Sequence, residues 1–120
     1  MKIIDEKYTI IHNRGDKGAL RLVNDKGGFK AGDKIKFSII ENKDYQDIAF
    51  QKTFEVTEDS KEFYLTFTNE EMRFSEPISK KKKYYYEIDM NDDTTLKGSD
   101  ELGDKKFILY PEAGKKEGEF

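Results

Sequence analysis

Apolar and polar residues alternate along two stretches of this chain, 34–40 and 84–90. The alternating apolar positions are Ile35, Phe37 and Ile39 in the first stretch and Tyr84, Tyr86, Ile88 and Met90 in the second. Successive residues of a strand point to opposite faces of its sheet, so each stretch predicts a strand with one buried face. In the second strand, Tyr85, Glu87 and Asp89 are expected to point away from the core.

Five more segments are rich in β-branched and aromatic residues and are separated by turns that contain Gly, Asn or Asp. The seven predicted strands cover residues 8–13, 19–23, 34–40, 48–56, 63–67, 84–90 and 106–110. Lys52 falls on the inward register of the fourth strand, which predicts a bulge or a break there. No segment is long enough for the helix of a parallel crossover. The sequence therefore predicts an all-β fold, an antiparallel Ig-like β-sandwich of about seven strands.

Two connections between the strands are longer than a simple turn. Residues 68–74 predict a single helical turn with Asn69 as its N-cap. Residues 91–104 predict a polar loop. We expect a single Ig-like domain over residues 1–113, followed by a flexible C-terminal tail over residues 114–120.

The composition limits the classes of partner and the cellular routes that we expect for this chain. Charged residues make up 39% of the chain, but the net charge is only −3, so we expect no nucleic-acid and no membrane partner. There is no cysteine, which excludes disulfides and thiolate metal ligands. No apolar run approaches the roughly 18 residues of a membrane span. The start at residues 1–6 lacks the apolar core of a signal peptide, so we expect synthesis in a cytoplasm without export by that route.

Residues able to carry catalysis or bind a metal are few. His12 is the single histidine, and the chain offers it neither a second imidazole nor a thiol. We therefore interpret His12 as a surface or strand-edge residue and predict no enzyme activity, no catalytic or metal site and no cofactor. The acidic residues between Asp89 and Glu101 lack the spacing of a calcium loop, which favours a solvated loop.

Two sequence motifs resemble binding motifs, one for nucleic acid and one for integrins, but the rest of the chain supports neither function. Four consecutive lysines, 80–83, precede three tyrosines, the composition of a single-strand nucleic-acid binder. We favour a solvated loop whose lysines protect the adjacent aggregation-prone strand. Arg14-Gly15-Asp16 is an integrin-binding tripeptide, but its Gly-Asp-Lys portion recurs at residues 32–34 and 103–105. This repetition indicates a turn phrase, and we assign no adhesion to it.

One surface feature favours an interaction. The outward positions of the last two predicted strands carry Tyr85, Ile108 and Tyr110. If these strands pair, their side chains form one exposed apolar patch. Such patches on small domains mark contacts with other proteins. We therefore predict a partner interface at these three residues.

The chain resembles the N-terminal β-sandwich domain family of baseplate upper proteins from phages of low-GC Gram-positive hosts. Five phrases carry the resemblance in the family's order, from about residue 13 to residue 113. They are Arg14-Gly15-Asp16 before a strand, the Phe-x-x-Gly-Asp-x-Ile-x-Phe-x-Ile pattern of residues 29–39, Lys52-Thr53-Phe54, Tyr84-Tyr85-Tyr86-Glu87-Ile88 and Phe107-Ile108-Leu109-Tyr110-Pro111-Glu112. In the fourth phrase Glu87 replaces the usual Asp, and a lysine run replaces the usual preceding Gly. These 120 residues do not contain the long extension of larger baseplate members.

The resemblance implies a non-enzymatic structural component of a phage or prophage virion, in its tail or baseplate. It implies assembly with other tail or baseplate proteins, homo-oligomers in the particle, and location in the virion after synthesis in the host cytoplasm. Multivalent use of one surface would strengthen such an assembly. Three alternatives remain: a carbohydrate-binding or adhesion module using Tyr64 or Tyr85, a capsid decoration protein, and a small inhibitor of a host defence enzyme.

Overall fold

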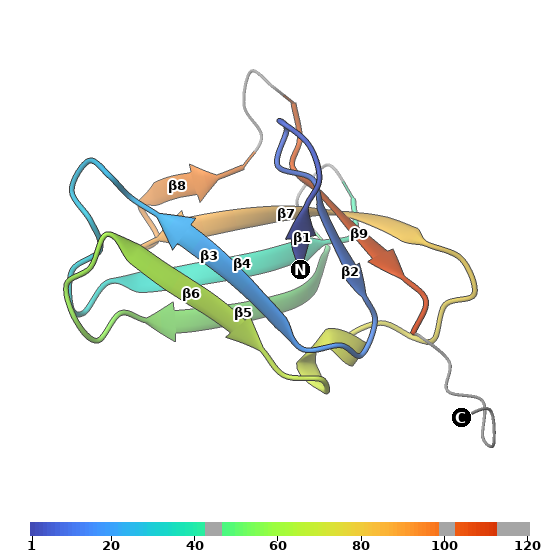
Figure 1. Cartoon of the computed structure of the whole chain (residues 1–120). Coiled ribbons are helices and arrows are strands. Elements are labelled where there is room, and N and C mark those ends of the chain that lie inside the picture. Colours follow the sequence, from blue (N-terminus) through green and yellow to red (C-terminus); the bar gives the residue numbers. More distant parts are fainter. Residues whose placement is uncertain (43–46, 99–102, 113–120) are drawn as a thin grey trace.

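The computed structural model of this chain describes residues 1–42, 47–98 and 103–112. Within these residues the fold is all-β, with two sheets and one 3-10 helix (Figure 1). The elements are β1 (Lys2–Ile3), β2 (Ile10–Asn13), β3 (Gly18–Val23), β4 (Lys34–Ile40), β5 (Ile48–Glu55), β6 (Glu62–Phe67), η1 (Glu71–Arg73), β7 (Lys82–Met90), β8 (Thr94–Lys97) and β9 (Lys106–Tyr110). No helix in these ranges has the length and apolar character needed to span a membrane.

The two sheets form a sandwich of unequal layers. The larger sheet has the strand order β1-β2-β9-β7-β4-β5. Its seventh strand, β8, is not part of this order and pairs with β7. The smaller sheet contains β3 and β6 and crosses over one face of the larger sheet (Figure 1). The prediction of a purely antiparallel sandwich is wrong at one place, because β2 and β9 are parallel. Parallel strands need a long connection, and here nearly the whole domain lies between them.

The predicted alternation in β4 and β7 is confirmed. Ile35, Phe37 and Ile39 have no solvent exposure, and Tyr84, Tyr86 and Ile88 are at most 1% exposed. Aromatic rings join the two sheets: the centroids of Phe37 in β4 and Phe67 in β6 lie 5.2 Å apart. Ring pairs at this separation add to the free energy gained from burying apolar area. The core between the sheets therefore combines Phe and Tyr rings with Ile and Leu side chains.

The predicted break at Lys52 is wrong. Lys52 lies in register within β5, opposite Phe37, and the irregular pairing occurs instead near Ile40. The ammonium group reaches the edge of the core, where it donates to the Thr66 carbonyl at 2.8 Å and to Glu71 at 2.9 Å. A long side chain can cover apolar surface and still place its charge at a polar partner, so no bulge is needed.

The first predicted strand is confirmed over residues 10–13 but begins two residues too early, and the predicted loop is wrong in part. Tyr8 has a positive φ of 59°, which an extended strand does not allow, and β2 begins only at Ile10. The expected loop over residues 91–104 contains β8, which pairs with β7. The alternation of Thr94–Lys97 carries too few apolar residues to have been recognised as a strand.

The helical turn is confirmed in position but not in its cap. η1 covers Glu71–Arg73, and Asn69 does not cap it. The backbone N–H of Glu71 donates to the Thr68 hydroxyl at 3.1 Å, and the Glu71 carboxylate accepts from the Thr68 N–H at 2.8 Å. This reciprocal pair is a capping box, which satisfies two backbone donors at the start of the turn. The predicted tail 114–120 lies outside the described residues.

Candidate interaction surfaces

The three residues predicted as an interface lie on the face of the larger sheet that points away from the core. Tyr85 belongs to β7, and Ile108 and Tyr110 belong to β9, which pairs with β7. Their neighbours Tyr84, Phe107 and Leu109 are fully buried on the opposite face of the sheet. All three predicted residues are partly exposed. We call Tyr85, Ile108 and Tyr110 together with Ile11 the outer patch.

Ile11 is the member of the outer patch that sequence reasoning missed. It lies in β2 directly opposite Ile108, and it is partly exposed. The pairing depends on the parallel contact between β2 and β9, so no local pattern could show it. Ile40 lies opposite Tyr85 on the same face but is only 2% exposed. Ile40 therefore lies beside Tyr85 but does not extend the exposed surface of the patch.

Two lysines lie among the residues of the outer patch. Lys83 lies opposite Ile108, and Lys106 lies opposite Tyr85; both are exposed. The Lys83 ammonium group lies 5.7 Å from the centre of the Tyr85 ring, within the range of a cation–π contact. Farther along β7, the pKa of the Glu87 carboxyl is raised by burial and by the nearby Asp89. The outward face of β7 thus changes from basic to acidic along its length.

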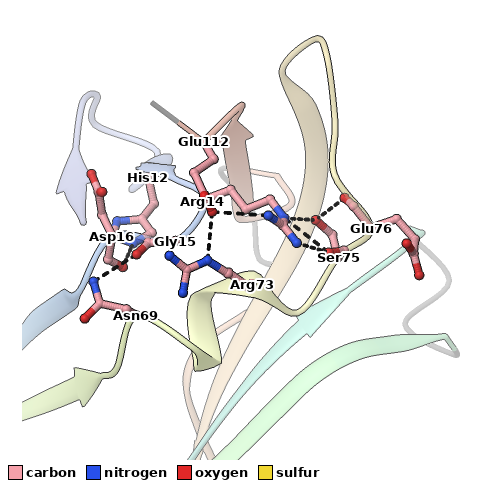
Figure 2. Close-up of polar contacts among 9 residues, drawn as sticks. All are labelled: His12, Arg14, Gly15, Asp16, Asn69, Arg73, Ser75, Glu76 and Glu112. Carbon is pink, nitrogen blue, oxygen red and sulfur yellow. Dashed lines mark hydrogen bonds and ion pairs between the residues drawn. The ribbon is translucent and has the colours of Figure 1, made fainter. Parts of the chain in front are cut away.

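A second group of residues is a polar cluster around the turn between β2 and β3 (Figure 2). The Arg14 side chain is only 12% exposed, and its guanidinium donates to the Ser75 carbonyl at 2.8 Å and to Glu112 at 3.2 Å. Arg73 donates to the same Glu112 oxygen at 2.9 Å. The Asn69 amide donates to the Gly15 carbonyl at 2.9 Å. The cluster joins three segments that are distant in sequence.

This geometry gives the Arg14-Gly15-Asp16 tripeptide a structural role. The Arg14 guanidinium faces Ser75 and Glu112, so it is not presented to a receptor (Figure 2). The His12 ring nitrogen donates to the Asp16 carbonyl at 2.8 Å, which fixes the far side of the turn. The interpretation of the tripeptide as a turn therefore has a physical basis in these contacts.

The prediction that His12 is a surface or strand-edge residue is wrong, because His12 is only 6% exposed. Its ring packs near Phe107, with the ring centroids 6.4 Å apart. Burial lowers the pKa of His12 below its ordinary value. Among the described residues no group of three or more His, Asp or Glu side chains is arranged to hold a metal ion. The predicted acidic positions Asp100 and Glu101 lie outside the described residues.

A cleft of about 340 Å³ lies between the two sheets beside β3. Its floor is apolar and includes Leu22, Tyr86 and Ile88, which are at most 9% exposed. Tyr8 and Lys97 lie at its mouth, with the Lys97 ammonium group 3.9 Å from the centre of the Tyr8 ring. Sequence reasoning did not find the cleft, because its walls come from β3, β7, β8 and the residues before β2.

Comparison of the chain with protein-family models, with curated proteins and with solved structures gives no match.

Proposed function

We propose that this protein is a non-enzymatic structural component of a phage or prophage particle, in its tail or baseplate. The ordered sequence phrases support the family, and the outer patch supports the mode of action. An Ig-like relationship of the sandwich and location in the virion are part of the same proposal. In it, the protein acts by holding neighbouring proteins in place.

The outer patch is the observation that carries this function. Tyr85, Ile108, Tyr110 and Ile11 come from three adjacent strands and share one face of the larger sheet. Aromatic and aliphatic side chains alternate here with lysines, and aromatic residues are enriched in protein–protein interfaces. The strands below are fixed by a fully buried core, so the patch is presented without a large cost in conformational entropy.

The partners in this proposal are further copies of the chain and other tail or baseplate proteins. A symmetric assembly repeats the same contact in every copy. A contact that is weak in a single copy becomes strong when several copies bind together. The protein therefore needs only a modest interface in each copy.

The test replaces the two aromatic residues of the outer patch. In the double variant Tyr85→Ser, Tyr110→Ser, we expect association with intact particles to fall at least about tenfold, since each buried aromatic side chain contributes more than 1 kcal/mol at an interface. Cosedimentation with purified particles measures this, and light scattering measures self-association. Tyr64→Ser is the matched control, because Tyr64 is 51% exposed on β6 in the smaller sheet. Unchanged association in the double variant would contradict the proposal.

A carbohydrate-binding module is the second candidate, and one observation favours it. Tyr64 lies opposite Arg21 on the outer side of the smaller sheet, and Arg21 is paired with Glu62 at 2.7 Å. An exposed aromatic ring beside polar hydrogen-bonding groups is suited to stacking on a sugar. Titration with host wall polysaccharide separates the two functions. Tight binding by the monomer that is lost in Tyr64→Ser would favour the carbohydrate module.

A further inference from the structure

β3 has one open edge. Within the described residues it pairs only with β6, in a two-stranded sheet. The backbone N–H of Asn24 donates to the Lys61 carbonyl at 2.8 Å, just beyond the end of β3. Hydrogen-bonded pairs recur at every second residue of an antiparallel ladder. Leu20 and Leu22 therefore bond to β6, while the N–H and C=O groups of Ala19, Arg21 and Val23 point to the open edge.

The cleft described above lies next to this open edge. Residues 20–23 of β3 and the following Asn24 form one of its walls, and Leu96 of β8 forms part of another. Side chains of a strand added beside β3 would alternate between the outer surface and the space between the sheets. Those lying opposite Leu20 and Leu22 would point toward the cleft. Open backbone groups and an apolar cleft thus occur together.

The two edges of the smaller sheet are protected differently. On the β6 side, Lys52 of β5 connects the sheets through the Thr66 carbonyl and Glu71. Inward-pointing charges of this kind are a common protection against unwanted strand pairing. On the β3 side, the inward positions are Gly18, Leu20 and Leu22, without a charge. The open edge is therefore suited to accept a strand.

We propose that the open edge of β3 and the adjoining cleft bind an extended segment of a partner protein, which adds a strand antiparallel to β3. Strand addition combines main-chain hydrogen bonds with side-chain pockets at alternate positions. The segment carries apolar side chains opposite Leu20 and Leu22. It carries a carboxylate opposite Arg21 on the outer surface, because the exposed guanidinium, which pairs with Glu62 of β6 at 2.7 Å, has further N–H donors for a second carboxylate. This surface is separate from the outer patch.

The positive charge of Arg21 argues against a second copy of β3 as the occupant of the open edge. Only one antiparallel register of two β3 strands lets all three open positions pair. That register places Arg21 directly opposite Arg21 of the other copy. Like charges at directly opposite positions destabilise a strand pair. A partner segment with a carboxylate there has the complementary charge.

The probe is a synthetic peptide, acetyl-Ser-Thr-Val-Glu-Val-Thr-Ser-amide, titrated into the isotope-labelled full chain. We expect its binding to shift the amide signals of Ala19, Arg21 and Val23 and to slow their hydrogen exchange. N-methylation of the peptide Glu removes the donor that faces Arg21, and we expect at least about fivefold weaker binding. N-methylation of either Val alters an N–H that points away from β3, so these peptides serve as matched controls and should bind within about twofold.

A variant of the protein, in place of a modified peptide, tests the same backbone contact. Val23→Pro removes one open N–H without removing a hydrogen bond to β6, and we expect peptide binding to be lost. Val23→Thr keeps the N–H and is the control; the thermal unfolding of both variants confirms that they fold. Absence of shifts at Ala19, Arg21 and Val23, or equal weakening by all N-methyl groups, would overturn the proposal. Protection of these amides in a dimer of the free protein would overturn the assignment to a partner.

Discussion

Gly15 is the residue on which the polar cluster depends. Its φ of +84° is strained for a residue with a side chain. A Cβ atom at this position would also collide with the Glu112 carboxylate, which holds both Arg14 and Arg73. Its N–H donates to the Met72 carbonyl at 3.1 Å. Backbone conformation and side-chain contacts therefore both require glycine.

We expect Gly15→Ala to lower the free energy of unfolding by about 2 kcal/mol, from the left-handed backbone and the displaced Glu112. Urea denaturation measures this. Gly27→Ala is the matched control, since nothing lies within 4 Å of its Cβ position, and we expect a change within about 0.5 kcal/mol. Equal stability of the two variants would show that the polar cluster does not stabilise the fold.

The roles of single residues were only partly predictable. The Gly-Asp-Lys repetition indicated a turn at Gly15, but no local pattern showed that Arg14 would face Ser75 and Glu112, 61 and 98 positions away. The burial of His12 was missed for the same reason. Its inward direction follows from the register of β2 against β9, at the other end of the chain.

At the scale of elements, β5 is an edge strand of the larger sheet. Its inward side carries Phe50, Lys52 and Phe54, and the Lys52 ammonium group lies 4.9 Å from the centre of the Phe54 ring. A lysine on an edge strand prevents pairing with other molecules, because pairing would bury its charge. Lys52 therefore both connects the sheets and protects this edge.

We expect Lys52→Val to increase concentration-dependent aggregation, since it creates a continuous apolar run on the inward side of an edge strand. The loss of the contacts to Glu71 and Thr66 should also lower the free energy of unfolding by about 1 kcal/mol. Light scattering during storage and urea denaturation measure the two effects. Thr53→Val, on the outward side of the same strand, is the control. If both variants aggregate alike, Lys52 has no protective role.

At the scale of the whole molecule, stability depends on pH through His12 in the core. Burial lowers the pKa of His12 in the folded state below that of the unfolded chain. The unfolded state then binds the proton more readily. Stability from this group is fully present above the unfolded pKa of about 6.5 and is lost as pH falls through the folded pKa.

We expect the free energy of unfolding to decrease between pH 7.5 and 6, by at most about 1.4 kcal/mol per pH unit for each proton bound. His12→Gln should remove the part due to His12. Burial also lowers the pKa of the Met1 amino group. Acetylation of that group is therefore the control for its contribution to the pH dependence of stability. Glu87, with its raised pKa, changes stability with the opposite sign. An unchanged pH dependence in His12→Gln would contradict this role.

The sequence by itself determined which side chains of β4, β7 and β9 enter the core, because strand alternation is local and fixes the face of each residue. It also placed Tyr85, Ile108 and Tyr110 on the outward face. Only the tertiary structure decided that β2 lies parallel to β9, that Ile11 joins the outer patch and that β3 leaves an open edge beside a cleft. These features depend on which strands become neighbours, and that is set by contacts between segments far apart in the chain.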